Sequence, residues 1–341
     1  MLSGYRMTVA DTGALVPRPN RSKRHDRLRL GLNAAKLVVS VGLVGYLLAR
    51  YAPTYDRLSH IDFAACAAAL ALIVLQTGLN TLRWRAILMH IAGARLPSAK
   101  LFPIYYTSVF FAQILPSVAG DLVRVLYHRM LRVPMGMVIV SVLLDRVLAT
   151  ASLLLIGAAT LPLMWRIDPQ GSVAGTMALV SGGGLLACCL GCAAVGTLRG
   201  TKLWAAIPQP LQTLATNVAW ALSSRMGLGQ LIPASVLVHS LTILAVYIIA
   251  RALGVPLDFG TALAIGPALL LAHIAPVSIG GWGVREAAAI VLLGPVGIDE
   301  ASAVLISVTF GLLIMLATLP GAVFWLLLRE ESRSAEGPHS P

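Results

Sequence analysis

Residues 275–287 read APVSIGGWGVREA and lie between two apolar runs. This short stretch holds a proline, three glycines, an arginine and a glutamate. Proline and glycine interrupt helices, and a charge inside a bilayer costs free energy. The stretch therefore predicts a helix that is broken inside a membrane, provided that the rest of the chain is a membrane protein.

The composition is that of a polytopic α-helical membrane protein. Of the 341 residues, 57% are hydrophobic and 12% are charged, which is about half the charged share of a soluble domain. Apolar runs of about twenty residues, long enough to cross a bilayer as a helix, recur along the chain. A β-barrel would instead show alternating segments of about ten residues. We predict an all-α fold with six full transmembrane helices, at 30–49, 61–82, 134–164, 173–197, 231–252 and 300–328.

Two further apolar regions, 101–131 and 259–297, are interrupted by proline, glycine and charge. Basic residues favour the cytoplasmic side, and they gather in the N-terminal tail and in the predicted loops 83–100, 124–132 and 198–229. This distribution is consistent only if the first broken region enters from the cytoplasm and returns to it, while the second enters and returns outside. We therefore predict two re-entrant hairpins and cytoplasmic termini. If each hairpin half crosses fully, the number of spans rises to eight or more.

The sequence predicts one membrane domain at 30–328, with halves at about 30–164 and 173–328. A basic tail at 1–29 precedes it, with seven basic and two acidic residues, and a short polar tail at 329–341 follows. The tail charge fits retention in the cytoplasm and contact with anionic lipid headgroups, and we expect no nucleic-acid partner.

The two broken regions share a sequence pattern. The first reads ILPSVAGDLVR (114–124) and the second reads IAPVSIGGWGVR (274–285). Both contain S-x-x-G-x-x-x-R after a proline, and opposite predicted orientations would make them an inverted repeat with discontinuous helices, as in many secondary transporters. The shared positions are Ser117, Gly120 and Arg124 in the first copy and Ser278, Gly281 and Arg285 in the second.

A helix that restarts inside the bilayer exposes free N–H groups and the positive end of its dipole. A serine can cap such an end, and an arginine one turn later adds a full positive charge. The two breaks therefore predict an anion pocket suited to a phosphate. The alternative is a structural kink, in which Arg285 is neutralised by Glu286 or by another carboxylate.

Asp145 and Arg146 lie inside the third predicted span. Adjacent residues on a helix do not face each other, so each needs another partner. Asp145 could pair with Arg124 or Arg285, and Arg146 could pair with Asp121 or with a lipid phosphate. A buried structural ion pair is the alternative, and Asp121 could also pair locally with Arg124.

We find no sequence motif for catalysis, a metal or a cofactor. The chain lacks a Walker A motif, H-E-x-x-H and G-x-S-x-G, so we expect no cofactor and no enzyme activity. The four cysteines are expected to pack between helices. His239 and His273 are expected to be packed or hydrogen-bonded, and Trp84 is expected to anchor a helix at the membrane interface.

Three stretches resemble one known family: LPSVAGDLVR (115–124), LLDRVLA (143–149) and PVSIGGWGVREA (276–287). This family is the lysylphosphatidylglycerol synthase transmembrane-region family, also called flippase-like integral membrane proteins, and the resemblance covers about 30–328. Ala119 departs from the family pattern, in which a glycine is expected. The resemblance implies that the site residues are Gly120, Asp121, Arg124, Asp145, Arg146, Ser278, Gly280, Gly281, Gly283, Arg285 and Glu286, to which the repeat adds Ser117.

In the best understood members of that family, the membrane unit is fused to a cytosolic aminoacyl transferase that makes lysyl-phosphatidylglycerol, and the membrane unit moves this lipid to the outer leaflet. Other members stand alone, some of them in hopanoid or polyprenyl-glycan pathways. This chain contains no transferase sequence, so the resemblance implies a stand-alone member that does not synthesise an aminoacylated lipid by itself.

We therefore expect a lipid translocator of the bacterial inner membrane. Its partner would be a membrane lipid, either a phospholipid or a polyprenyl-phosphate-linked lipid, whose anionic or phosphate-bearing headgroup binds at the broken-helix tips. One alternative is a glycosyl or phosphoryl transferase that uses a polyprenyl-phosphate carrier. Another is a non-transporting accessory subunit of a lipid-modifying or hopanoid pathway.

Overall fold

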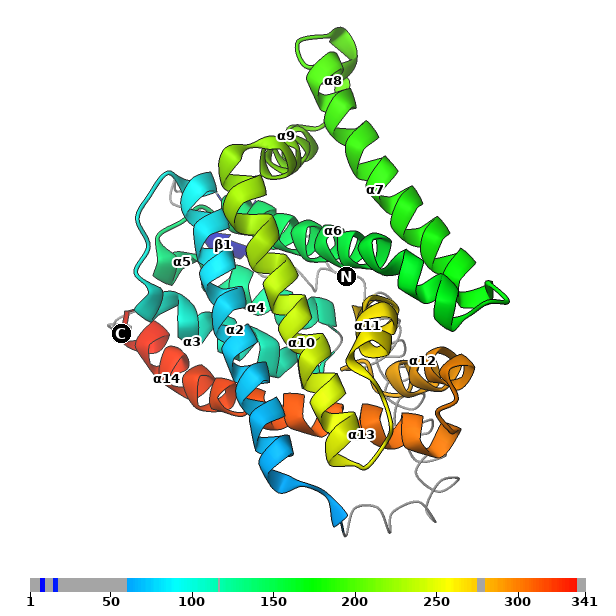
Figure 1. Ribbon diagram of the computed structural model, residues 1–341. Coiled ribbons are helices and arrows are strands. Elements are labelled where there is room, and N and C mark those ends of the chain that lie inside the picture. Colours follow the sequence, from blue (N-terminus) through cyan, green and yellow to red (C-terminus); the bar gives the residue numbers. More distant parts are fainter. Residues whose placement is uncertain (1–6, 10–14, 18–59, 116, 275–279, 336–341) are drawn as a thin grey trace, which may run out of the picture.

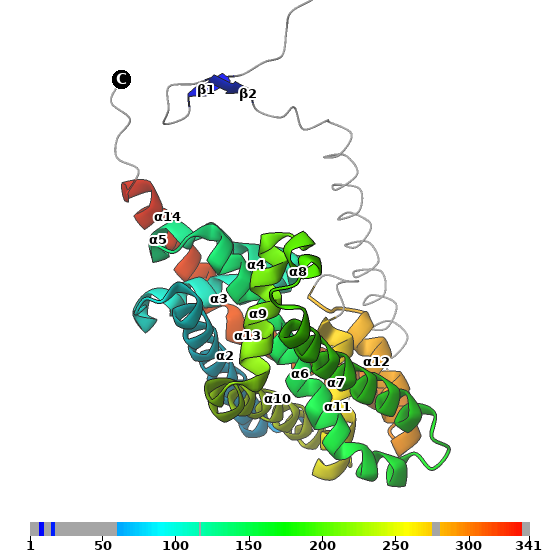
Figure 2. The same cartoon turned by 90° about the horizontal axis from the view of Figure 1, so that it is seen from above.

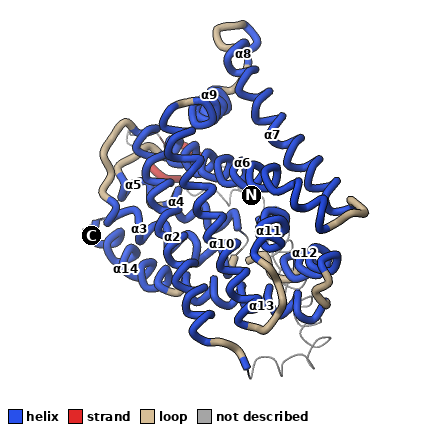
Figure 3. Tube along the Cα trace, viewed as in Figure 1, coloured by secondary structure: helices blue, strands red, loops and turns tan. Residues whose placement is uncertain are grey.

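The computed structural model is helical almost throughout the residues that it describes (Figure 3). Two strands of three residues, β1 (Met7–Val9) and β2 (Leu15–Pro17), pair antiparallel near the N-terminus. All other regular structure in this part of the chain is helical. The described residues are 7–9, 15–17, 60–115, 117–274 and 280–335.

Five helical elements within these ranges are long and apolar enough to cross a membrane. They confirm five of the six predicted spans and make the chain a multi-pass membrane protein; the predicted span at 30–49 lies outside the described residues. The five are α2 (Phe63–Ala92), α6 (Met135–Ile167), α7 (Ser172–Leu198), α10 (Ile232–Ala252) with a π-helical turn at Gly227–Leu231, and α13 (Glu300–Thr318) continued by α14 (Pro320–Ala335).

Both predicted breaks separate two helices in the structure. In the first region α3 (Ser98–Ile114) is followed by α4 (Ser117–Leu126) and the short α5 (His128–Leu131). In the second region α11 (Phe259–Ile274) is followed by α12 (Val284–Leu293). In each region the second helix packs against the first.

Gly120 allows α4 to fold back onto α3. A Cβ atom at this position would lie 2.6 Å from both the Cβ of Ala112 and the carbonyl oxygen of Ser108. The hydroxyl of Ser108 also donates a hydrogen bond of 2.8 Å to the Gly120 carbonyl oxygen. Only glycine permits so close an approach between the two helices. The glycine expected at the first break thus has a packing function.

The turn before α12 is built from glycines in the left-handed region. Gly280, Gly281 and Gly283 have φ angles of 59°, 76° and 85°, which favour glycine. A Cβ atom at Gly280 would lie 2.7 Å from the carbonyl oxygen of Gln113, near the end of α3. The two broken regions therefore meet at this point.

The remaining helices surround the broken regions. Figures 1 and 2 place α2 beside α10 and α11 beside α12, while α14 packs against α3 and α11 packs against α6. The helix α7 diverges from α6 in Figure 1 and buries only Ala174, Met177 and Ser181. The connection after it forms α8 (Lys202–Ala206) and α9 (Gln209–Ser223).

The end of α2 differs from the prediction. We placed Arg83 in a loop, but α2 continues to Ala92 and is closed by Gly93 in the left-handed conformation. Arg83 and Trp84 are consequently buried. Trp84 does not anchor the helix at an interface, since its indole N–H donates to the hydroxyl of Ser141 at 3.1 Å.

We expect Gly120→Ala to lower the free energy of unfolding by about 1–3 kcal/mol, because the added methyl group collides with backbone atoms of α3. The measurement is the thermal unfolding midpoint of the purified protein in detergent. Gly183→Ala is the matched control, since Gly183 lies within α7 and no atom would approach its Cβ within 4 Å. Equal midpoints for the two variants would contradict the proposed packing function of Gly120.

Candidate functional site

Five charged side chains from α2, α4 and α6 form one continuous series of ion pairs, which we call the arginine–aspartate chain. Asp145 accepts from the Nε atom of Arg83 at 2.9 Å and from the Nη1 atom of Arg124 at 3.0 Å. Asp121 accepts from Arg124 and from two nitrogen atoms of Arg146, at 2.9 and 3.0 Å. The order is therefore Arg83, Asp145, Arg124, Asp121, Arg146.

The exposure of these side chains increases along the arginine–aspartate chain. Arg83, Arg124 and Asp145 are buried, whereas the side chain of Asp121 is 19% exposed and that of Arg146 is 42% exposed. A buried charge is tolerated only when it is paired and hydrogen-bonded. Three guanidinium groups face two carboxylates, so the chain as a whole keeps one positive charge.

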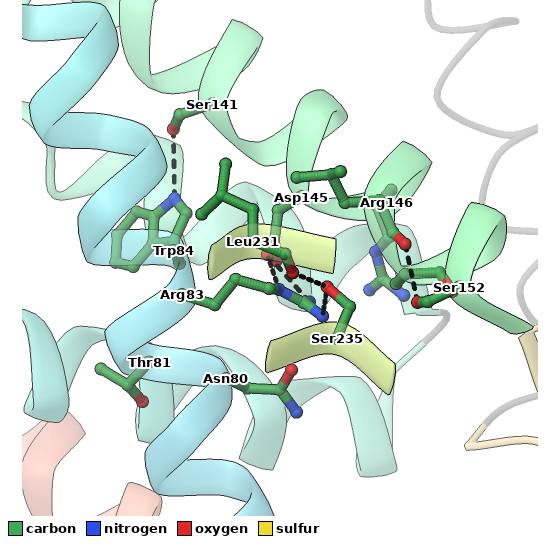
Figure 4. Close-up of polar contacts among 12 residues, drawn as sticks. Asn80, Thr81, Arg83, Trp84, Ser141, Asp145, Arg146, Ser152, Leu231 and Ser235 are labelled. Carbon is green, nitrogen blue, oxygen red and sulfur yellow. Dashed lines mark hydrogen bonds and ion pairs between the residues drawn. The ribbon is translucent and has the colours of Figure 1, made fainter. Parts of the chain in front are cut away.

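The buried arginines are held in place by neighbouring side chains. The Nη1 atom of Arg83 donates to the hydroxyl of Ser235 at 2.9 Å, which links α2 to α10 (Figure 4). The guanidinium carbon of Arg124 lies 5.3 Å from the ring centroid of Trp84 and 5.1 Å from that of Tyr105. Such contacts between a cation and aromatic faces are attractive, and they fix Arg124 between α2 and α3.

All five members of the arginine–aspartate chain line a cavity of about 220 Å³. Its other polar lining residues include Asn80, Gln113, His239 and His273. Gly280 also lines the cavity, at the contact between the broken regions. A polar cavity of this size holds several water molecules or a small polar group. The cavity lies where the two predicted breaks come together.

The cavity residues include two buried polar atoms that have no hydrogen-bond partner, the Nε atom of Arg124 and the Nδ1 atom of His273. An unpaired buried polar group costs about 1–3 kcal/mol. His239, by contrast, is hydrogen-bonded through its Nε2 atom to the carbonyl oxygen of Ala149 at 3.1 Å, as expected for a packed histidine. The cavity therefore combines positive charge with unsatisfied polar atoms.

Arg285 and Glu286 form a second, separate pair. The Nη2 atom of Arg285 lies 2.8 Å from the Oε1 atom of Glu286, and both residues contact the hydroxyl of Ser307 at 3.0 Å. The backbone N–H of Gly283 donates to Glu286, and Arg285 lies over the ring of Trp282. Both side chains are buried and neither lines the cavity.

The predicted site residues therefore divide into groups. The cavity is lined by Asp121, Arg124, Asp145, Arg146 and Gly280. Gly120 joins α4 to α3, Gly281 packs against His273, Gly283 precedes α12, and Ser117 begins α4. Ser278 lies outside the described residues.

The expected partners of the charges on α6 are present in the structure. Asp145 pairs with Arg124, and Arg146 pairs with Asp121. The alternative pairing of Asp145 with Arg285 does not form, because Arg285 pairs with Glu286. These two are adjacent in sequence, so our general rule against such pairs does not hold at the beginning of α12.

Arg83 and Ser235 belong to the site but were not found from the sequence. The residues after Arg83 continue an apolar helical face, with Trp84, Ile87 and Leu88 all buried. This periodicity, which continues up to Gly93, was the signal that Arg83 lies within a helix rather than in a loop.

The family expected from the three motif stretches is confirmed by comparison with known proteins. A family model described as Lysylphosphatidylglycerol synthase TM region matches residues 33–321, which is most of the chain. A search of curated proteins found no match.

We expect Arg83→Met to lower the free energy of unfolding by about 3–5 kcal/mol, because the buried Asp145 loses one of its two partners. Arg95→Met is the control: Arg95 is exposed in the connection after α2, and its replacement should change stability by less than about 0.5 kcal/mol. Chemical or thermal unfolding in detergent measures both. Similar stabilities for the two variants would rule out a structural function for the pair of Arg83 and Asp145.

Proposed function

The chain belongs to the lysylphosphatidylglycerol synthase TM region family, and on this basis we propose that it is a lipid translocator. Its cavity would bind the anionic or phosphate-bearing headgroup of a membrane lipid. The observation that carries the proposal is the arginine–aspartate chain, which brings three guanidinium groups and only two carboxylates to one cavity. Ionisable residues inside a membrane commonly mark a substrate path.

Arg146 is the residue that would meet the headgroup first. It is the most exposed member of the arginine–aspartate chain, and its Nε and Nη2 atoms both point to the carboxylate of Asp121. A carboxylate held by two parallel N–H groups has the geometry that a phosphate also accepts from arginine. A headgroup phosphate would therefore share Arg146 and Arg124 with Asp121, which stays paired.

The fold supports the proposal that the bound phosphate belongs to a lipid. The cavity is formed by helices that include the membrane-spanning α2, α6 and α10, so a bound headgroup would leave its acyl or polyprenyl tails in the surrounding bilayer. We propose a phospholipid or a polyprenyl-phosphate-linked lipid as the cargo. The chain would move this lipid without changing it chemically and without a cofactor.

The movement would come from the two broken regions. We propose that α3 with α4, and α11 with α12, are re-entrant hairpins related as an inverted repeat, and that one half of the protein rocks against the other. Their mutual contact at Gln113 and Gly280 supports this arrangement. The basic N-terminal tail supports a cytoplasmic N-terminus. We propose a cytoplasmic C-terminus as well, and the bacterial inner membrane as the location.

The test is mass spectrometry of the lipids that co-purify with the full-length protein. We expect one phosphate-bearing lipid to be enriched over the bulk membrane, and Arg146→Gln to reduce that enrichment about tenfold or more, because a charged two-point contact is lost. Arg129→Gln is the control, since Arg129 is exposed on α5, away from the cavity. Both variants should unfold at the wild-type temperature within a few degrees.

Other outcomes would favour the alternatives. A lipid profile equal to that of the bulk membrane, and unchanged in Arg146→Gln, would exclude the headgroup site and favour an accessory subunit. Turnover of a nucleotide sugar by the purified protein would favour a transferase that uses a polyprenyl-phosphate carrier.

A further inference from the structure

The carboxylates that line the cavity are all engaged by arginine. Asp145 accepts from Arg83 and Arg124, and Asp121 accepts from Arg124 and Arg146. The remaining acidic residue at the breaks, Glu286, is paired with Arg285 and does not line the cavity. Among the described residues of the cavity wall, therefore, no carboxylate is left to receive an ammonium group.

The other polar groups of the cavity wall are suited to hydroxyls rather than to charges. Asn80 and Gln113 carry neutral amides, which both donate and accept hydrogen bonds. His239 contacts the carbonyl oxygen of Ala149 through its Nε2 atom, so its Nδ1 atom is an acceptor in the neutral ring. The wall thus offers one net positive charge, from the arginine–aspartate chain, beside several neutral hydrogen-bonding groups.

We infer that the cavity selects a headgroup with a single phosphodiester charge and uncharged hydroxyls, and rejects a headgroup that carries amino groups. The inference rests on the proposed headgroup site and narrows its substrate class. A phosphodiester charge of −1 balances the +1 of the arginine–aspartate chain. The lysyl ester of phosphatidylglycerol would instead place ammonium groups beside three guanidinium groups. Like charges that are brought together in a poorly hydrated site repel each other strongly.

This selection would exclude lysyl-phosphatidylglycerol, the lipid in the family's name, as a ligand of the cavity. Lysyl-phosphatidylglycerol contains the same phosphodiester as phosphatidylglycerol, but its headgroup is cationic overall. Repulsion between one ammonium group and the cavity wall should lower the affinity for the lysyl ester by at least about tenfold. Single charge–charge contacts at binding sites often change affinity by more than this.

The experiment is a titration of the delipidated full-length protein, followed by native mass spectrometry. The probes are short-chain phosphatidylglycerol, its lysyl ester, short-chain phosphatidylethanolamine and the tail-free diester glycerophosphoglycerol. We expect phosphatidylglycerol to bind at least about tenfold more tightly than the lysyl ester, with phosphatidylethanolamine weaker than phosphatidylglycerol. We expect glycerophosphoglycerol to bind more weakly than phosphatidylglycerol, because it has no acyl tails to remain in the detergent.

A matched pair of variants tests whether the charge of the wall sets the preference. Gln113→Glu adds a carboxylate to the cavity wall and should reduce the preference for phosphatidylglycerol over its lysyl ester about tenfold. Gln209→Glu adds the same charge at the exposed beginning of α9 and should leave the preference unchanged.

The outcomes separate this inference from the proposed function. If the lysyl ester binds as tightly as phosphatidylglycerol and both need Arg146, the charge selection is overturned and the headgroup site remains. If Arg146→Gln weakens the binding of none of the lipids, the headgroup site itself is overturned. If glycerophosphoglycerol matches phosphatidylglycerol, the ligand is a soluble phosphodiester and the lipid assignment is overturned. An unchanged preference in Gln113→Glu would also contradict selection by the charge of the wall.

Discussion

The positive charge of Arg124 must be neutralised inside a bundle of apolar helices, and much of the packing follows from this requirement. Arg124 stands on α4, so its partners Asp145 and Asp121 tie the first broken region to α6. Asp145 in turn engages Arg83, which reaches Ser235 and so brings in α10. One charge therefore fixes the relative positions of four helices, because leaving any member unpaired in the interior costs several kcal/mol.

The same sequence pattern has different consequences in the two broken regions. In the second copy, the residue after Arg285 is Glu286, which neutralises the arginine within its own helix. In the first copy, the residue after Arg124 is Val125, so Arg124 takes a carboxylate from α6 as well as Asp121 from its own helix. The residue that follows each arginine thus decides which of the two arginines lines the cavity. A symmetric pattern in the sequence produces an asymmetric site.

The sequence was sufficient to predict those features for which few alternative structures or interaction partners exist. The apolar runs at α2, α6, α7, α10 and α13 were predicted because their length and composition match a bilayer. The pairing of Arg146 with Asp121 was among the predicted options, because an intramembrane charge needs a partner and few were present. Arg83 was missed, since the end of a helix is poorly defined by composition alone. The separation of Arg285 from the cavity depends on how α12 is rotated against α13, which is a tertiary property.

The cavity owes its position to a contact between backbones rather than between side chains. Gly280 meets the carbonyl oxygen of Gln113 where a side chain would not fit, so the second broken region closes the cavity against the first. The buried anchors of each region lie elsewhere, at Gly120 against α3 and at Arg285 against Ser307 of α13. On the proposed rocking mechanism, the two regions could separate at Gly280 while these anchors stay intact. The arginine–aspartate chain would then keep its charge balance while the cavity opens, because none of its members comes from the second region.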